Sequence, residues 1–189
     1  MKELGQGRWL LVAACSLLIL QGCAKESAPP TAVPAAQEKQ LGETLAVIVP
    51  GGGTYSRAIS TDSERTQIFF DQGLRFAWGF FFPESIASYQ QASLADPTHP
   101  MPYWGMAHAM GPNPNSRYVR MPDDPKGEGL KAITKAKDRI GRASPMEAQL
   151  INALFVLYDK ESIADDNDRD RAYLAAMREI NRQQTLFWS

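Results

Sequence analysis

Residues 69–115 read FFDQGLRFAWGFFFPESIASYQQASLADPTHPMPYWGMAHAMGPNPN. Small and aromatic side chains recur in the first part of this stretch at a spacing that places them on one face of an α-helix. These positions are Phe69, Gly73, Phe76 and Phe80. The spacing predicts a helix that packs through aromatic rings against a neighbouring helix.

A second helix is predicted after a short turn. Pro83 fits its first turn, because the N–H that proline lacks would have no helical partner there. Asp96-Pro97 ends it. Its predicted inner face consists of Ile86, Tyr89, Ala92 and Ser93. The two helices form a predicted antiparallel hairpin, and a third helix follows directly.

Capping signals mark the ends of several predicted helices. Thr61 and Glu64 fit a capping box at the start of the first helix, and Ser144 and Glu147 fit a second box further along. Gly111 suits a left-handed cap at the end of the third helix. These signals divide the chain from Thr61 onward into a series of helices.

The C-terminal half is predicted to hold three more helices. The first covers about residues 126–142, the second begins at Ser144, and the last begins near residues 166–168. Their predicted inner faces are Leu130, Ile133, Lys137 and Ile140 in the first, Leu150, Ile151, Leu154, Phe155 and Tyr158 in the second, and Tyr173, Met177 and Ile180 in the last.

Composition excludes two classes of protein. The 189 residues carry 20 basic and 21 acidic side chains, for a formal net charge of -1. Nucleic-acid binding normally needs a clustered basic surface, so we predict no nucleic-acid partner. Both cysteines, Cys15 and Cys23, lie near the N-terminus. A disulfide framework or a cysteine metal site in the body of the protein is therefore excluded.

The N-terminus has the pattern of a lipoprotein signal peptide. An apolar run over residues 9–20 is too short to span a membrane and fits a signal-peptide core. Leu20-Gln21-Gly22-Cys23 looks like a bacterial lipobox, which predicts cleavage before Cys23 and lipidation of its thiol. Cys15 is a rival lipobox position, and an uncut signal anchor is a further alternative. Ala24 favours sorting to the outer membrane rather than the inner.

The segment behind Cys23 is predicted to be a flexible tether. Residues 24–40 are rich in Ala, Pro and charged side chains and lack the apolar content of a core. Leu45–Val49 is a short apolar run, consistent with a strand or with an extended segment laid on the helical body. Gly51–Gly53 resembles a phosphate loop only superficially, because the Lys-Ser/Thr of that motif is absent.

The hairpin sequence resembles a tetratricopeptide repeat. The residues that carry the resemblance are Gly73, Phe76, Tyr89, Ala92 and Pro97. Gln72 and Ser85 depart from it, since leucine and alanine are usual there. One period of about 34 residues after Phe69 lies Tyr103, and Ala107 takes the next small-residue position.

A longer resemblance covers about residues 62–182. The stretches FDQGLRFAWGF, PMPYWGMAHAMGPNPNSRY, MPDDPKGEG and SPMEAQLINALFVLYD are similar to a family of bacterial tetratricopeptide-type proteins of unassigned function. The resemblance implies an all-α stack of hairpins that continues through further repeats. Because this chain ends on the apolar sequence QTLFWS, we expect a truncated member whose last helix lacks a neighbour.

The histidines and methionines suggest an alternative function. His99 and His108 lie among Met101, Met106, Met110 and Met121, and imidazole with thioether ligands suits copper. Methionines on a helix that faces a partner are more often core residues. No hydrolase motif is present, and paired acids such as Asp123-Asp124 suit helix starts. We therefore predict no metal, no cofactor and no enzymatic activity.

The loop over residues 113–120 is the predicted partner-binding site. It interrupts a repeat, and insertions in repeat arrays often lie on the binding face. Arginine and tyrosine are residue types that anchor interfaces. The alternative is that its asparagines only satisfy backbone groups in a turn. The candidate residues are Asn113, Asn115, Arg117, Tyr118 and Arg120.

These observations predict a signal peptide over residues 1–22, a tether and extended segment over 23–60, and a tetratricopeptide-like helical domain over 61–189. The predicted function is a lipid-anchored scaffold that binds a protein or peptide in the cell envelope, facing the periplasm from the outer membrane. Homodimerisation through the open end of the stack is possible. A copper-handling lipoprotein is the second hypothesis, and an enzyme of unknown type is the third.

Overall fold

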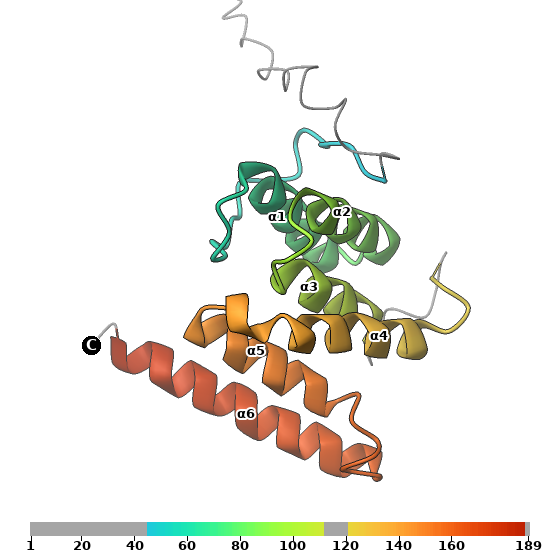
Figure 1. Cartoon of the computed structure of the whole chain (residues 1–189), viewed down its shortest axis with the longest axis vertical. Coiled ribbons are helices and arrows are strands. Elements are labelled where there is room, and N and C mark those ends of the chain that lie inside the picture. Colours follow the sequence, from blue (N-terminus) through green and yellow to red (C-terminus); the bar gives the residue numbers. More distant parts are fainter. Residues whose placement is uncertain (1–44, 112–120, 188–189) are drawn as a thin grey trace, which may run out of the picture. The chain divides into compact units, whose positions relative to one another are not determined.

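The computed structural model describes residues 45–111 and 121–187, with side chains through Gln184. All of them belong to one unit of the chain, Pro34–Ser189. The described residues form six α-helices and a short 3-10 helix, without a strand (Figure 1). The predicted all-α fold class is confirmed for this part of the chain.

Helix α1 (Glu64–Trp78) begins one residue after Ser63, which is its N-cap. The Ser63 side chain accepts from the Thr66 N–H at 3.2 Å. The predicted cap at Thr61 is wrong, because Ser63 takes the N-cap position and the Thr61 hydroxyl is engaged elsewhere. Its hydroxyl donates to Asp96 Oδ2 at 2.9 Å and so links the start of α1 to the end of the next helix.

The C-terminal end of α1 also differs from the prediction. The helix ends at Trp78, and Phe80 adopts a positive φ of 63°, a region that residues with a side chain rarely occupy. Phe80 therefore lies outside the helix, and 64% of its surface is exposed. Phe69 and Gly73 belong to the buried face as predicted, whereas Phe76 is half-buried.

Helix α2 (Phe82–Ala95) has Pro83 in its first turn and ends before Asp96, as predicted. The buried Tyr89 ring lies between two glycines, Gly73 of α1 and Gly105 of α3. A Cβ added at Gly73 would lie 2.6 Å from Tyr89 Cε1, and one at Gly105 would lie closer still. The absence of a side chain at both positions lets the Tyr89 ring connect three helices.

Helix α3 (Met101–Met110) ends at Gly111. The predicted left-handed cap is wrong, because Gly111 has φ −62° and ψ −179°, an extended conformation. The physical reason is the next residue in the chain, Pro112, which disfavours helical backbone in the residue before it. The chain therefore leaves α3 in an extended direction.

Helix α4 (Pro125–Asp138) is capped by Asp124, whose carboxylate accepts from the Gly127 N–H at 2.9 Å. The helix is rotated about its axis relative to the prediction, so a different face is buried. Leu130, predicted on the inner face, is 41% exposed. Small residues let α4 lie close to its neighbours. The buried residues are Gly129, Ala132, Ile133 and Ala136. The predicted helix over 126–142 is also shorter, because a 3-10 turn, Ile140–Arg142, follows it.

Helix α5 (Pro145–Val156) begins with the predicted capping box of Ser144 and Glu147. Helix α6 (Asp166–Phe187) begins at the predicted position. The buried Arg169 guanidinium donates to the Ala164 carbonyl at 2.8 Å and so holds the preceding loop. Ile180 is buried, as predicted from its spacing on the helix.

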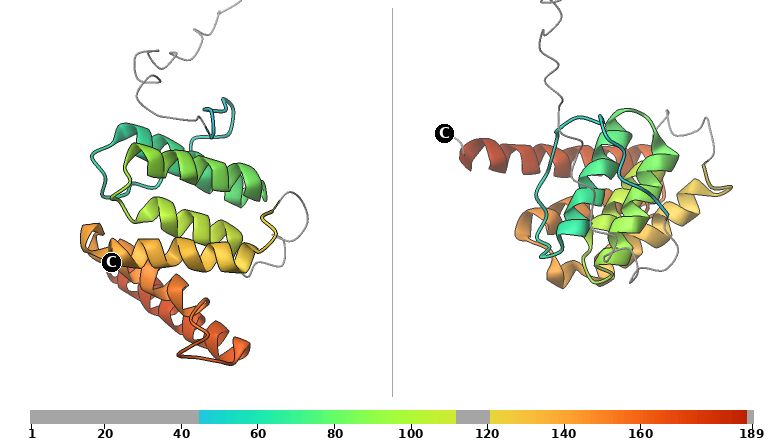
Figure 2. Two further views of the ribbon diagram at one scale, coloured as in Figure 1. Left: turned by 45° about the vertical axis from the view of Figure 1, so that its right-hand side comes forward. Right: turned by 90° about the horizontal axis from the view of Figure 1, so that it is seen from above.

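Consecutive helices pack in pairs, α1 with α2, α3 with α4 and α5 with α6. Helices α2 and α3 also pack together, so the first two pairs form a continuous core (Figure 2). Tyr158, just after α5, extends this core to the third pair. Its hydroxyl donates to the Ala107 carbonyl at 2.6 Å, and its ring lies against Gly129.

Candidate functional site

Residues 45–60 form an extended arm that lies on α1 and α2. Two glutamine side chains form hydrogen bonds with the main chain of its first part. Gln91 Oε1 of α2 accepts from the Leu45 N–H at 2.8 Å. Gln72 of α1 accepts from the Val49 N–H at 2.8 Å and donates to the Val47 carbonyl at 2.9 Å. The arm therefore crosses the hairpin with its peptide groups facing the two helices.

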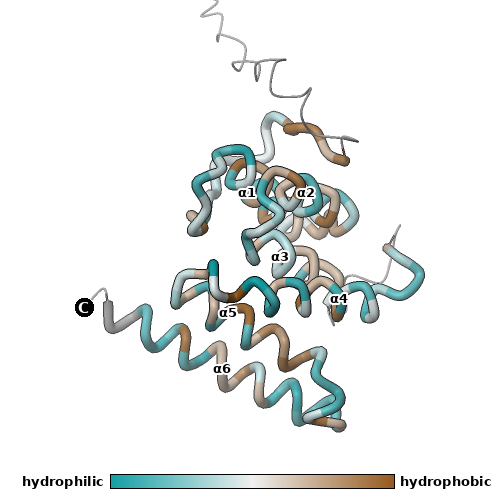
Figure 3. The backbone as a smooth tube through the Cα atoms, in the orientation of Figure 1, coloured by the Kyte–Doolittle hydropathy of each residue, from teal (hydrophilic) through white to brown (hydrophobic). Residues whose placement is uncertain are grey.

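Both glutamines are buried, although a buried amide is costly unless its polar atoms are hydrogen-bonded. The Gln72 amide is satisfied by the arm and by Ser88 Oγ at 3.1 Å. The apolar side chains of the first part of the arm are exposed, and Val47 is 67% exposed. Figure 3 shows this part of the arm as a hydrophobic stretch of the chain. The helical body therefore recognises the main chain of this segment rather than its side chains.

The second part of the arm returns along α1 and is held in the same way. The Asp71 carboxylate accepts from the Arg57 N–H at 2.9 Å and from Ser56 Oγ at 2.6 Å. Gln67 accepts from the Ile59 N–H at 2.9 Å and donates to the Arg57 carbonyl at 2.9 Å. These bonds fix the backbone of Arg57 on both sides and leave its side chain free to point away.

The arm ends at a cluster that joins three parts of the chain. The Ser60 N–H donates to Glu147 Oε1 of α5 at 2.7 Å, and its hydroxyl donates to Glu147 Oε2. His99, from the turn between α2 and α3, places Nε2 3.2 Å from the same hydroxyl. His99 is fully buried and Glu147 is 5% exposed. The arm is thus attached to the turn before α3 and to α5, as well as to the first helix pair.

The hydrogen-bond donors and acceptors in this cluster are arranged differently from those in the catalytic triad of a serine hydrolase. The Met101 N–H donates to His99 Nδ1 at 3.3 Å, so Nδ1 is the unprotonated nitrogen of a neutral ring. Nε2 then carries the proton and donates to Ser60 Oγ. In a catalytic triad the serine donates to the imidazole, whereas here it donates to a carboxylate. The geometry supports a fastening role for Ser60, His99 and Glu147.

The cluster also shifts the pKa values of its members. Burial lowers the pKa of His99, and the neighbouring carboxylates of Glu147 and Asp96 offset that effect only in part. Burial alone would raise the pKa of Glu147, but hydrogen bonds from Ser60 and Ser144 outweigh it and hold the pKa below its usual value. Neutral imidazole and ionised carboxylate are therefore the favoured forms.

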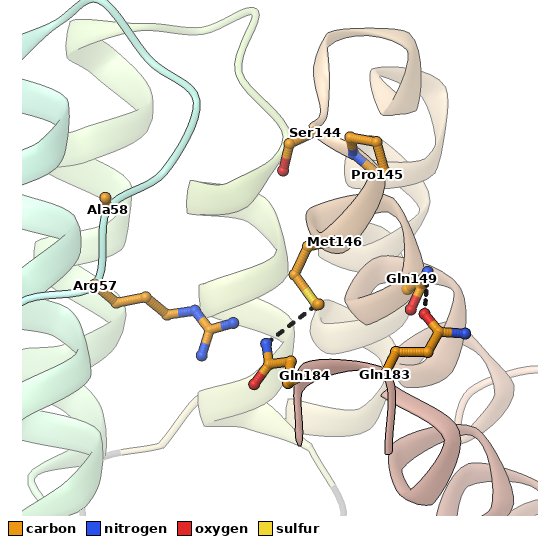
Figure 4. A pocket seen from close by; sticks show the side chains of 8 residues that line it. All are labelled: Arg57, Ala58, Ser144, Pro145, Met146, Gln149, Gln183 and Gln184. Atoms are coloured by element: carbon orange, nitrogen blue, oxygen red, sulfur yellow. Dashed lines mark hydrogen bonds between the residues drawn. The ribbon is translucent and has the colours of Figure 1, made fainter. Parts of the chain in front are cut away.

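A pocket of about 720 Å³ opens beside this cluster. The arm forms one wall through Arg57 and Ala58, and α5 and the C-terminal part of α6 form the others. Figure 4 shows the Arg57 side chain extending from the arm toward Met146 and Gln184. The remaining lining residues are Ser144, Pro145, Gln149 and Gln183. Among its described lining residues, the pocket combines one cation, three glutamine amides and apolar surface.

The predicted site residues lie elsewhere in the chain. The five candidates of the 113–120 loop and the lipidation site Cys23 fall outside the described residues. The predicted partner-binding and lipidation sites therefore stay predictions. These residues are Asn113, Asn115, Arg117, Tyr118, Arg120 and Cys23.

The histidines and methionines of the copper hypothesis occupy separate places. Met101, Met106 and Met110 belong to the hydrophobic core. His108 stacks on Trp104 with ring centroids 5.2 Å apart, whereas His99 joins the Ser60 cluster. Within residues 45–111 and 121–187, no group of three His, Cys, Asp or Glu side chains is placed to hold a metal ion.

Sequence reasoning missed the residues that hold the arm. The sequence holds one sign of the arm's contacts, Gln72, which is a polar residue on an apolar helix face where the resemblance expects leucine.

Comparisons with protein-family models, curated proteins and solved structures found no match to this chain. Of the helices in the described residues, none is both long and apolar enough to cross a membrane.

Proposed function

We propose that this protein is a tetratricopeptide-like scaffold that binds an extended peptide segment of a partner protein. The observation that carries the proposal is the arm on α1 and α2. Gln72 and Gln91 hold the main chain of residues 45–49 and leave its side chains exposed. A helical body that binds the peptide groups of its own chain in this way is suited to bind a further extended segment, of varied sequence, beside the arm.

The repeat architecture is supported by two similar contacts. Tyr89 lies against glycines of α1 and α3. Tyr158 lies against Gly129 of α4 and donates to the Ala107 carbonyl of α3. In each case a tyrosine fills the space that small residues leave between consecutive helices. We infer that the helix pairs are units of a solenoid, whose stacked pairs offer an extended binding surface.

We further propose that the scaffold is anchored in the bacterial cell envelope through a lipid on Cys23. The lipobox and the polar segment that follows it support this location, and Ala24 supports the outer membrane. Stable anchoring requires more than one acyl chain, which lipidation of an N-terminal cysteine supplies. The binding surface would then face the periplasm.

Site-specific photocrosslinking in living cells tests this proposal. A photoreactive residue at Ala58, which lines the pocket, is expected to capture a discrete partner. The matched control is Leu174, 47% exposed on α6 and outside that pocket. The Gln72→Ala variant should weaken capture at Ala58. Absence of an adduct at Ala58, or equal adducts at both positions, would overturn the proposal. A fatty-acid probe that labels Cys23→Ser as strongly as the parent protein would overturn the anchoring.

A further inference from the structure

The Arg57 guanidinium can donate hydrogen bonds to a ligand in the pocket beside the arm. Its backbone is fixed by Asp71 and Gln67, but its side chain forms no hydrogen bond or ion pair with the described residues. A guanidinium suits an anion because its planar fork matches the two oxygens of a carboxylate, and the fixed backbone of Arg57 keeps the base of this side chain at the pocket wall. The position of Arg57 therefore points to an anionic ligand group.

The amides of the pocket add groups that match a peptide main chain. Gln184 donates to the thioether sulfur of Met146 at 3.4 Å, and sulfur is a weak acceptor. A ligand carbonyl would be a better acceptor for the same N–H. Gln149 donates to Gln183 at 3.0 Å, and its own carbonyl oxygen accepts no hydrogen bond from the described residues. The rim thus offers both a donor and an acceptor.

The apolar lining residues and the charge of the pocket limit the class of ligand further. Met146, Pro145 and Ala58 supply apolar surface for a side chain or a main-chain segment. Among the described residues that line the pocket, Arg57 is the only cationic one, so a singly charged carboxylate matches it better than a phosphate does. Glu147 lies nearby, but its carboxylate is engaged by Ser60 and Ser144.

We propose that this pocket binds an acidic side chain of an extended peptide. Arg57 pairs with the Asp or Glu carboxylate, the glutamine amides bind the adjoining peptide groups, and Met146 supports the apolar part of the segment. The inference rests on the proposed function and names its ligand class. The arm that fixes Arg57 is then part of the binding site.

The test uses the full-length protein in detergent and defined fluorescent peptide pools. The peptides are nine residues long, acetylated and amidated, with glutamate in the central position of one pool and glutamine in the other. We expect the glutamate pool to bind about tenfold more tightly, as anisotropy titration would measure. The Arg57→Gln variant should abolish this preference, and Arg57→Lys should retain part of it. Arg178→Gln, which changes an exposed arginine on α6, should keep it in full.

Each of the following outcomes would overturn the inference that the pocket binds an acidic side chain. Equal binding of both pools would overturn the acidic-side-chain proposal and leave the peptide-binding function standing. Binding only by a third pool with a free C-terminal carboxylate would show that the pocket recognises a chain terminus instead. Failure of every pool to bind at millimolar concentration would overturn the proposed function as well. Because the Arg57 side chain has no hydrogen-bond or ion-pair partner among residues 45–111 and 121–184, its variants should keep the helical signal in circular dichroism.

Discussion

Ser60 and Glu147 are separated by 87 positions in the chain, yet the Ser60 N–H donates to Glu147 Oε1 at 2.7 Å. The other carboxylate oxygen accepts from the Ser144 N–H at 2.7 Å as part of the capping box of α5. One side chain therefore caps a helix and fastens the extended arm to it. This contact brings the arm to the edge of the pocket that Arg57 lines.

Glu147→Gln should destabilise the protein by about 1–3 kcal/mol, the range for loss of hydrogen bonds to a buried charged group. An amide offers only one acceptor atom, whereas the carboxylate serves both Ser60 and Ser144 with two. Urea denaturation followed by circular dichroism measures the change. Glu161→Gln is the control, because Glu161 is exposed. A change no larger than that of the control would contradict the fastening role.

Stability should fall on acidification in two stages. The folded-state pKa of His99 lies below its usual 6.5, because burial disfavours the charged ring. The unfolded chain therefore takes up this proton first, and stability declines as pH falls below about 6.5. His108 adds to this stage, since burial lowers its pKa as well. The contribution of Glu147, whose folded pKa is also lowered, is lost below about pH 4.5.

Urea denaturation at a series of pH values checks this prediction. The free energy of unfolding should be highest above pH 6.5 and lower at pH 5.5. His99→Gln should reduce the difference between these two conditions, and Glu147→Gln should reduce the further loss below pH 4.5. A stability that stays constant or rises between pH 6.5 and pH 5.5 would contradict the assignment of a neutral buried His99.

Gln72→Leu should release the first part of the arm while the helical hairpin persists. Leucine suits the buried position but cannot bond Val49 or Val47, so the Val49 N–H loses its acceptor. Hydrogen exchange at Val49 should become at least about tenfold faster. Gln90→Leu is the matched control, because that half-buried glutamine side chain does not contact the arm through a hydrogen bond. Equal exchange in the two variants would show that Gln72 does not hold the arm.

Gly73→Ala should cost about 1–3 kcal/mol of stability, the usual range for overpacking a core. The new methyl group would lie 2.6 Å from Tyr89 Cε1, and Tyr89 is fully buried and has little room to move. Gly141→Ala provides the control, since a Cβ there meets nothing within 4 Å. Thermal melting of both variants measures the difference. Equal melting temperatures would contradict the close packing of α1, α2 and α3 around Tyr89.

The helices could be predicted from sequence because their signals are local. Periodic apolar residues, Pro83 and the Ser144 capping box all act within one or two turns of a helix. Local signals also explain two errors. Thr61 and Ser63 are both capping residues, and only contact with Asp96 decides between them. The prediction for Leu130 is wrong because mostly small residues, rather than large apolar ones, form the buried face of α4.

The candidate site could not be predicted in the same way. Gln91 contacts Leu45 across 46 positions, and Glu147 contacts Ser60 across 87, so no local pattern joins them. Only Gln72 gave a hint, as a polar residue on an apolar face. Arg57 had no sequence signal at all, because its importance comes from a fixed backbone and a pocket that α5 and α6 complete.

The most direct test of peptide binding is to map it on the isotopically labelled full-length protein by NMR. We predict that acetylated and amidated peptide pools shift the side-chain amide signals of Gln149, Gln183 and Gln184 and the guanidinium signal of Arg57 in a saturable way. Signals from the outer face of α6, such as Leu174, should stay unchanged. An absence of saturable shifts at Arg57 and the three glutamines, up to millimolar peptide, would contradict the proposal that this protein is a peptide-binding scaffold.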